Sequence, residues 1–289
     1  MDSHFLKYQA FIKTVELGSF TRAGEALFRS QSGISRMIDD LEREWGITLL
    51  ERGHSGVGLT SEGLRLLPHV RRVCEEQRLL QAQVDELNGL HSGLIRIGTF
   101  SSVATYWLPN IIREFRKDHP GIDYEFLLGD YSEIEQWLFE GRVDCGFLRL
   151  PVRSGLESRF LERDELLAVL PEGHRLAQSG EAVPLAELAR EPFMLLEKSG
   201  KSEVSQLFEA HALRPFVRFT TWDDYSIMSM VENGLGVSIL PRLILRRIPW
   251  RIAVRPLDVP AFRDIGLAFP QGRSLSQAAR RFLGYVEHR

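Results

Sequence analysis

The sequence of 289 residues has few cysteines, no long apolar run and no excess of charge of one sign. Its two cysteines, Cys74 and Cys145, lie far apart, which argues against a disulfide framework and favours a reducing compartment. No apolar run approaches the roughly 18 residues that a membrane-spanning helix needs. The first residues show neither the basic nor the apolar region of a secretory leader, so we expect a cytoplasmic protein with no membrane partner.

The charge balance excludes bulk attraction to nucleic acid. Lysine and arginine number 36 against 39 acidic residues, which leaves a net charge of −3. Any nucleic-acid binding must therefore depend on the local placement of basic groups. Catalytic motifs are missing too, including the GxSxG elbow, HExxH, CxxC and the P-loop, and the histidines lack metal-ligand spacing. We therefore expect no cofactor, no metal and no enzymatic activity.

Three short helices and a strand pair are expected in residues 1–60. Apolar residues recur at helical spacing over residues 5–15, and a second helix follows Thr21, which can either cap it or bind a phosphate. A third helix covers residues 31–45 and is ended by Gly46. Two short strands around a glycine-rich turn then form a wing. The second and third helices are a helix-turn-helix candidate.

One long helix is expected over residues 61–88. Seven of its positions alternate by four and three, a 3.5-residue repeat that favours pairing with a second copy of the helix. These positions are Leu66, Val70, Val73, Gln77, Leu80, Val84 and Leu87. The alternative is an amphipathic helix packed on its own domain. The length of the helix favours self-pairing.

Strands and helices alternate from residue 93 onward, which predicts an α/β part with mostly parallel sheets in two lobes. Within it, one helix is expected over residues 104–117, two strands over residues 156–171 and a last helix over residues 274–289. We place lobe I at about residues 93–162 and 266–289, and lobe II at about residues 163–265.

Many N-terminal residues at fixed spacing carry a resemblance to a known family. They include Gly18-Ser19-Phe20-Thr21, Ala26-Leu27, Ser30-Gln31-Ser32, Ile34-Ser35-Arg36, Leu41-Glu42 and Leu59-Thr60. The chain resembles the LysR-type transcriptional regulators of bacteria over its whole length, more loosely after residue 93. The resemblance implies a winged helix-turn-helix over residues 1–60, a dimerising linker helix and hinge over 61–92, and an effector domain over 93–289. That domain is expected to resemble type 2 periplasmic binding proteins.

The resemblance also implies partners. Members of this family bind promoter DNA, assemble as homotetramers (dimers of dimers) and respond to a small-molecule effector, whose identity the sequence leaves unknown. RNA polymerase is expected as a further partner. The expected function is therefore sequence-specific DNA binding, and DNA bending, modulated by an effector bound between two lobes.

The expected base contacts lie at the start of the third helix, because a recognition helix reads the major groove with its N-terminal residues. They are Gln31, Ser32, Ser35 and Arg36. Glutamine suits adenine, arginine suits guanine or a phosphate, and serine adapts to either. Two nearby residues depart from the family: Gly33 weakens the helix, and Asp39 stands where many members carry a cation.

Further DNA contacts are expected at the wing. Arg52 can reach the DNA backbone, or it can pair with Glu51 or Glu44. His54 and Ser55 can enter the minor groove. With so few basic groups in each protomer, a monomer should bind weakly, and assembly adds avidity.

The expected effector site lies where strands end and helices begin, because free helix N–H groups there suit an anion. Its candidate residues are Phe100, Ser101, Ser102, Asp130, Arg149, Ser199, Lys201, Ser202, Thr221, Trp222 and Asp223. The serines, the aromatic residues and the arginine fork together suit a small organic or aromatic acid. Alternatives remain: the serines at 101 and 102 can cap a helix, Arg149 can pair with Asp130, and Trp222 can be packing.

Two other classes of function remain open. Residues 93–289 alone fit a solute-binding protein of transport, against which stand the missing leader and the helix-turn-helix. An enzyme on a bilobal fold, such as a dehydratase, needs an acid/base pair in the cleft, for which Asp130 with Asp223 is the candidate. Cys145 lies in a predicted strand and is expected to be a buried, inert thiol rather than a redox sensor.

Overall fold

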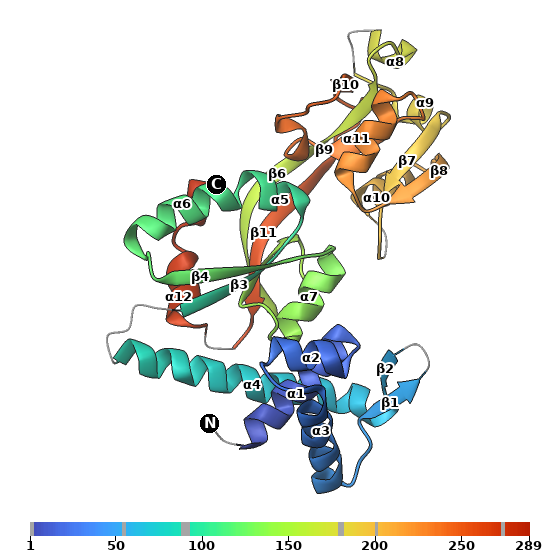
Figure 1. Cartoon of the computed structure of the whole chain (residues 1–289). Coiled ribbons are helices and arrows are strands. Elements are labelled where there is room, and N and C mark those ends of the chain that lie inside the picture. Colours follow the sequence, from blue (N-terminus) through green and yellow to red (C-terminus); the bar gives the residue numbers. More distant parts are fainter. Residues whose placement is uncertain (1–2, 54–55, 88–92, 179–181, 200–201, 273–274) are drawn as a thin grey trace. The chain divides into compact units, whose positions relative to one another are not determined.

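The computed structural model describes residues 3–53, 56–87, 93–178, 182–199, 202–272 and 275–289 (Figure 1). Its contacts divide the chain into two compact units. The first takes in the residues up to 90, and the second takes in nearly all residues from 91 onward. Each unit has an apolar core of its own, as expected of separate domains.

The first unit is helical with one strand pair. Its elements are α1 (Ser3–Leu17), α2 (Phe20–Ala26), α3 (Gln31–Trp45), β1 (Leu50–Gly53), β2 (Gly56–Leu59) and α4 (Ser61–Leu87). The two strands pair antiparallel, with Leu50 opposite Leu59. All four helices contribute to one core, which includes Phe11, Ala23, Ile34, Ile38, Leu41 and Leu67. This is the winged helix-turn-helix that the sequence predicts.

The second unit alternates strands and helices. Its first elements are β3 (Gly93–Thr99), α5 (Ser101–Tyr106), α6 (Leu108–Asp118), β4 (Ile122–Leu128), α7 (Tyr131–Glu140), β5 (Cys145–Arg149) and β6 (Leu156–Pro171). They are followed by α8 (Arg175–Gln178), α9 (Leu185–Leu188), β7 (Pro192–Leu196), α10 (Glu203–Ala210), β8 (Phe216–Thr221) and α11 (Asp224–Glu232). The last are β9 (Ser238–Pro241), η1 (Ile244–Arg246), β10 (Ile252–Arg255), β11 (Phe262–Pro270), α12 (Gln277–Phe282) and η2 (Val286–His288).

Two long strands, β6 and β11, connect two lobes within this unit (Figure 1). Residues 156–165 of β6 pair antiparallel with β11, and the rest of β6 pairs with β9 and β10. The expectation of two strands over residues 156–171 is therefore wrong. A single strand of 16 residues changes partners half-way, and no turn is needed.

The lobes have separate apolar cores. The core of lobe I contains Trp107, Phe115, Phe147 and Phe282. Lobe II has two clusters, one around Phe193 and Phe208 and the other around Met194, Ile227 and Met228. The two lobes are thus joined mainly through the crossing strands, which is an arrangement that allows them to change their relative angle.

Three local expectations need correction. The sheet is mixed rather than mostly parallel, because β3 pairs parallel with β4 and β5 while the crossing strands pair antiparallel. The helix expected over residues 104–117 is two helices that meet at Trp107, with Pro109 in the first turn of α6. The last helix is short, and a 3₁₀ turn follows it. Among the described residues, no helix is long and apolar enough to cross a membrane.

Candidate functional site

The N-terminal end of α3 presents polar side chains to the surface. The Ser30 hydroxyl caps the helix by accepting the Gly33 backbone N–H at 3.1 Å. Gly46 ends the helix in the left-handed conformation, at φ +64°. Ile34, Ile38 and Leu41 turn one face of the helix into the core, which leaves the predicted reading residues on the other face. Of these, Gln31, Ser32 and Arg36 are exposed and Ser35 is half-buried.

The predicted base-contact residues differ in whether their side chains already have partners within the protein. Among the described residues, Arg36 makes no side-chain hydrogen bond or ion pair, so its guanidinium is available to a base or phosphate. The Ser35 hydroxyl donates to the Asp39 carboxylate at 3.4 Å. Asp39 therefore places a negative charge beside a predicted base contact, which weakens phosphate binding on that side of the helix.

The turn between α2 and α3 depends on a close backbone approach at Gly24. The Arg29 backbone N–H donates to the Gly24 carbonyl at 2.8 Å, and a Cβ on Gly24 would lie 2.6 Å from the Arg29 carbonyl oxygen. Ser19 caps α2, so the alternative in which Thr21 is the cap is wrong. Thr21 is exposed, and its contact with a phosphate stays a prediction. Arg22 in the same helix and Arg29 in the following turn are also exposed.

The wing strands are present, but most of the predicted wing contacts lie outside the described residues. Arg52 lies opposite Val57 in the strand pair, and its side chain is not among those described. His54 and Ser55 are also outside the described ranges. Glu44, one of the alternative partners of Arg52, forms an ion pair with Lys7 instead.

The predicted 3.5-residue repeat along α4 has two parts that differ in burial. Val70 is buried and Leu66 is half-buried in the core of the first unit, so this end of the repeat packs on its own domain. Val73, Leu80 and Val84 are 46%, 61% and 40% exposed, and Gln77 is half-buried. The Leu87 side chain is outside the described ones. Among the positions of the repeat whose side chains are described, those after residue 72 are accessible to another helix.

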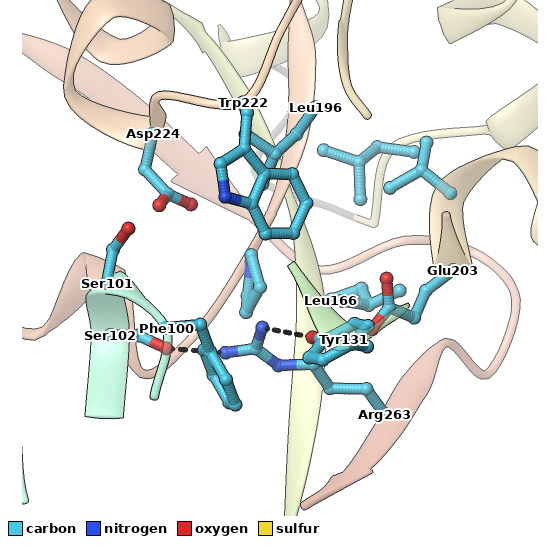
Figure 2. A pocket seen from close by; sticks show the side chains of 13 residues that line it. Phe100, Ser101, Ser102, Tyr131, Leu166, Leu196, Glu203, Trp222, Asp224 and Arg263 are labelled. Atoms are coloured by element: carbon cyan, nitrogen blue, oxygen red, sulfur yellow. Dashed lines mark hydrogen bonds between the residues drawn. The ribbon is translucent and has the colours of Figure 1, made fainter. Parts of the chain in front are cut away.

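A buried arginine of the second unit, Arg263, lies beside Tyr131 and Ser102 (Figure 2). Arg263 from β11 is 5% exposed and Asp164 from β6 is 2% exposed. The Asp164 carboxylate accepts from Arg263 Nε at 2.9 Å and from Nη2 at 2.8 Å. Nη1 donates to the Tyr131 hydroxyl at 3.0 Å, and Nη2 donates to Ser102 Oγ at 2.8 Å. The guanidinium also lies over the Phe100 ring, 5.0 Å from its centroid.

Beside this arginine lies a small cavity of about 30 Å³, which we call the inner pocket. Both lobes and the crossing strands line it: Phe100, Ser101, Ser102, Tyr131, Leu166, Leu196, Glu203, Val204, Trp222, Asp224, Ile239, Pro241 and Arg263. Asp224 faces Ser101 across it (Figure 2). Burial raises the pKa of Asp224, although the charge of Arg263 and a hydrogen bond from Ser101 oppose the rise. The inner pocket has room for a group of about the size of a water molecule.

A larger cavity of about 320 Å³, the outer pocket, adjoins it. It is lined by Asp130, Tyr131, Ser132, Glu135, Arg149, Pro151, Glu197, Lys198, Ser199, Ser202, Glu203, Gln206 and Trp222. Tyr131, Glu203 and Trp222 line both pockets, so the two are neighbours. The volume is at the small end of the range for ligand sites.

The predicted effector residues divide between these two pockets. Phe100, Ser101 and Ser102 line the inner one, and Trp222 lines both. Asp130, Arg149, Ser199 and Ser202 line the outer one. Thr221 and Asp223 line neither, and Lys201 lies outside the described residues. The proposed acid/base pair of Asp130 and Asp223 is thus not assembled in either pocket.

The structure bears on the alternatives raised for the serines, Arg149 and Trp222. Phe100 is the N-cap residue of α5 and no side chain caps that helix, so capping by Ser101 or Ser102 is wrong. Arg149 forms no ion pair with Asp130 among the described residues, and its guanidinium lies 5.7 Å from the centroid of the Tyr131 ring. Trp222 packs edge-to-face on Tyr131, with centroids 6.3 Å apart, and also lines the pockets.

Comparison with known proteins identifies the family. Residues 6–64 match the family model "Bacterial regulatory helix-turn-helix protein, lysR family", and residues 88–289 match "LysR substrate binding domain". The chain is 31% identical over 278 residues to the uncharacterized regulator YvbU of Bacillus subtilis, covering 95% of this chain and 94% of the relative. The chain belongs to the LysR family of transcriptional regulators.

Other relatives agree with this identification. The chain is 36% identical over 262 residues to the probable regulator LrrA of Synechococcus elongatus, covering 90% of this chain and 88% of that one. The crystal structure of full-length CbnR with its target DNA shares the fold, with a TM-score of 0.71 and 23% identity over 99% of both chains. This LysR-family protein is accordingly a DNA-binding transcriptional regulator with an effector-binding domain.

Sequence reasoning missed the charged centre of this effector domain. Arg263, Asp164, Asp224 and Glu203 were not among the predicted residues, although all four line or support the inner pocket. The sequence contains one weak indication of this centre. Charged residues interrupt the apolar pattern of predicted strands, and a charge buried in a strand needs a partner. The side chains of Asp224 and Asp223 have different roles: Asp223 caps α11, while Asp224 is buried.

No cluster of three potential metal ligands occurs among the described residues. Cys145 is fully buried, as predicted, and burial raises the pKa of its thiol. Burial also raises the pKa of the Cys74 thiol to about 11. At both positions burial thus favours the thiol over the thiolate, which is the nucleophilic form.

Proposed function

We propose that this regulator reads promoter DNA with the N-terminal end of α3, through Gln31, Ser32, Ser35 and Arg36. The observation that carries the proposal is the exposed guanidinium of Arg36, which has no partner among the described residues and lies in the second turn of a helix whose opposite face is buried. Thr21, Arg22 and Arg29 supply phosphate contacts from the preceding helix and turn. Arg52, His54 and Ser55 contact DNA from the wing.

The regulator functions as a dimer of dimers. Few cations surround the recognition helix, so a single protomer binds DNA weakly and assembly adds avidity. The exposed residues Val73, Leu80 and Val84 of α4 form the pairing surface, with Gln77 fixing the register. Changing Leu80 to glutamate should yield a smaller species in light scattering. The exposed Gln83→Glu is the matched control and should leave the mass unchanged.

The effector is a small molecule with a carboxylate, bound between the lobes. The inner and outer pockets, lined from both lobes, adjoin at Tyr131, Glu203 and Trp222. Arg263 lines the inner one, and its partners lie on α5, α7 and β6. A ligand there shifts the angle between the lobes, and the assembly transmits the shift to the spacing of the DNA-binding domains and to DNA bending. Linkage requires that DNA change the effector affinity by the same factor.

Neither a transport protein nor an enzyme fits the site as well. The DNA-binding domain has no use in solute transport, and Asp130 and Asp223 do not meet in a pocket. Incubation with candidate metabolites should give no turnover. The regulator acts in the cytoplasm, where the chromosome lies, and alters the access of RNA polymerase to promoters.

The first test is fluorescence anisotropy against the DNA upstream of the protein's own gene, over a series of salt concentrations, with scrambled DNA as control. Tight, salt-dependent binding that prefers the native fragment supports the proposal. Arg36→Ala should weaken specific binding by about tenfold or more. The matched control is Arg43→Ala, an exposed arginine in the last turn of the same helix, paired with Asp40. Equal losses in the two variants would contradict the assignment of the reading end.

A further inference from the structure

We propose that the effector is a zwitterion, an α-amino acid, whose carboxylate binds Arg149 and whose ammonium binds the carboxylates of Asp130 and Glu203 in the outer pocket. The inference rests on the proposed effector role and adds the second charge of the ligand. It follows from which charged groups of the pocket already have partners and which do not.

Asp130 supplies one unpartnered oxygen. The residue is 2% exposed, and it accepts Ser132 Oγ at 2.6 Å and the Glu133 backbone N–H at 2.8 Å through Oδ1. Its Oδ2 is buried and has no hydrogen-bond partner among the described residues. Burial raises its pKa, but the hydrogen bonds from Ser132 and Glu133 and the charge of Lys198 oppose burial, and the pKa is lowered overall. A buried, ionised oxygen without a donor is costly, so the site favours a ligand that provides one.

Glu203 supplies the second oxygen. It is the first residue of α10, and its Oε1 is also buried without a partner among the described residues. Figure 2 shows its carboxylate beside Tyr131, at the point where the two pockets meet. The nearby Arg263 does not neutralise it by hydrogen bonding, because its guanidinium donates to Asp164, Tyr131 and Ser102.

Arg149 is the cation left for the ligand. Lys198, the other described cation lining the pocket, donates to both oxygens of Glu133, at 2.9 and 2.8 Å. Arg149 has no ion pair or side-chain hydrogen bond among the described residues and only lies over the Tyr131 ring. Its fork suits a carboxylate.

The other acids of the pocket already have partners. Glu135 accepts the Arg153 backbone N–H at 3.0 Å. Glu197 accepts the Ser202 backbone N–H and the Ser205 hydroxyl, both at 2.7 Å. Among the described residues of the outer pocket, the charged groups without a partner are thus the Arg149 guanidinium and one carboxylate oxygen each of Asp130 and Glu203. A ligand with only a carboxylate would leave the oxygens unpaired, and an amine alone would leave Arg149 unpaired.

The volume and the lining of the outer pocket narrow the class of ligand that can bind there. About 320 Å³ accommodates one amino acid but is small for a nucleotide. Tyr131 and Trp222 provide an aromatic wall against which an apolar or aromatic side chain of the ligand packs.

The test uses the full-length protein without DNA. Thermal shift with the common α-amino acids selects binders, and calorimetry then compares each binder with its matched acid and amine, such as phenylalanine with phenylpropionate and phenethylamine. At least one amino acid should raise the Tm and bind about tenfold or more tightly than either analogue. A panel in which no amino acid binds, or in which the acid binds as well as the amino acid, overturns the proposal.

Two conservative variants test which residues bind the charged groups of the ligand. Glu203→Gln and Arg149→Gln should each weaken binding of the selected amino acid by about tenfold or more, and Glu203→Gln should not weaken binding of its matched acid. Exposed Glu157→Gln and Arg218→Gln are the matched controls, and the Tm without ligand verifies folding. Unchanged amino-acid affinity in folded Glu203→Gln overturns the proposal. Failure here leaves operator binding and its dependence on Arg36 intact, so it is distinct from failure of the proposed function.

Discussion

The recognition end of α3 and the centre of the effector domain each contain an arginine, in opposite situations. Arg36 is exposed and has no partner among the described residues. Arg263 is 5% exposed and donates to Asp164, Tyr131 and Ser102. The first guanidinium is free to bind something outside the protein, whereas the second already holds three elements of the protein together. Residue type alone therefore does not reveal the role of an arginine; its partners do.

The sharpest test of this comparison removes the buried arginine. Arg263→Ala leaves Asp164 buried without its counter-ion and should cost about 3–5 kcal/mol of unfolding free energy. Arg163→Ala is the matched control, because Arg163 is 62% exposed and also pairs with an aspartate, Asp264, through two hydrogen bonds. As a solvent-exposed ion pair it should contribute little to stability, so this variant should unfold at nearly the urea concentration of the parent. Urea unfolding measures both, and similar losses would show that burial does not distinguish the two pairs.

A second test concerns the turn that positions the recognition helix. In Gly24→Ala, the new Cβ would lie 2.6 Å from the Arg29 carbonyl oxygen, so the backbone must shift. We expect a loss of about 1–3 kcal/mol and weaker DNA binding. Gly58→Ala is the control, since its Cβ would meet nothing within 4 Å and the change should stay within about 0.5 kcal/mol. An unaffected Gly24→Ala variant in urea unfolding would contradict the close approach.

The contrast between the recognition end of α3 and the charged centre of the effector domain also explains which features could be predicted from the sequence. The ends of α3 are determined locally, by the Ser30 cap and by Gly46, and the predicted bounds agree with the structure. The charged centre is not local: Arg263 is 161 residues from Ser102 and 99 residues from Asp164. No periodicity within one segment indicates such a contact.

The expectations that Val70 faces a second copy of the helix and that residues 156–171 form two strands were wrong for a related reason. An apolar repeat shows which face of α4 is covered but not what covers it, and Val70 turned out to pack on its own domain. Asp164 looks like a strand end in sequence, yet its burial against Arg263 allows β6 to continue. The pocket residues that were predicted follow strand ends, where topology alone gathers polar groups.

A third test separates stability from recognition within one turn of helix. Ser30→Ala removes the cap that accepts the Gly33 N–H and should cost about 1 kcal/mol. Ser32→Ala, two residues on, is exposed and should change stability by less than about 0.5 kcal/mol while weakening operator binding. Thermal unfolding and anisotropy measure the two effects. If Ser32→Ala lost stability and kept its DNA affinity, Ser32 would be a structural residue.

The smallest expected effect concerns Asp224 and depends on pH. Burial raises the pKa of Asp224 above its unfolded value of about 3.9, so the folded state holds its proton more tightly than the unfolded state does. Its contribution to stability is present below the unfolded pKa and is lost as the pH rises through the folded pKa. Asp224→Asn removes this loss, and its oxygen can still accept from Ser101. The Tm of the variant relative to the parent should therefore increase from about pH 4 to about pH 7.

The control for Asp224→Asn is the adjacent Asp223→Asn. Asp223 is exposed and caps α11 by accepting the Tyr225 backbone N–H at 3.1 Å, a role that asparagine fills equally well. It thus reports what an aspartate-to-asparagine change does at a surface cap of the same helix. If both variants followed the same pH dependence in Tm, the burial of Asp224 against the inner pocket would not be the cause. A rise confined to Asp224→Asn would show that the effector domain keeps a buried acid at the expense of stability, as expected of a residue retained for binding.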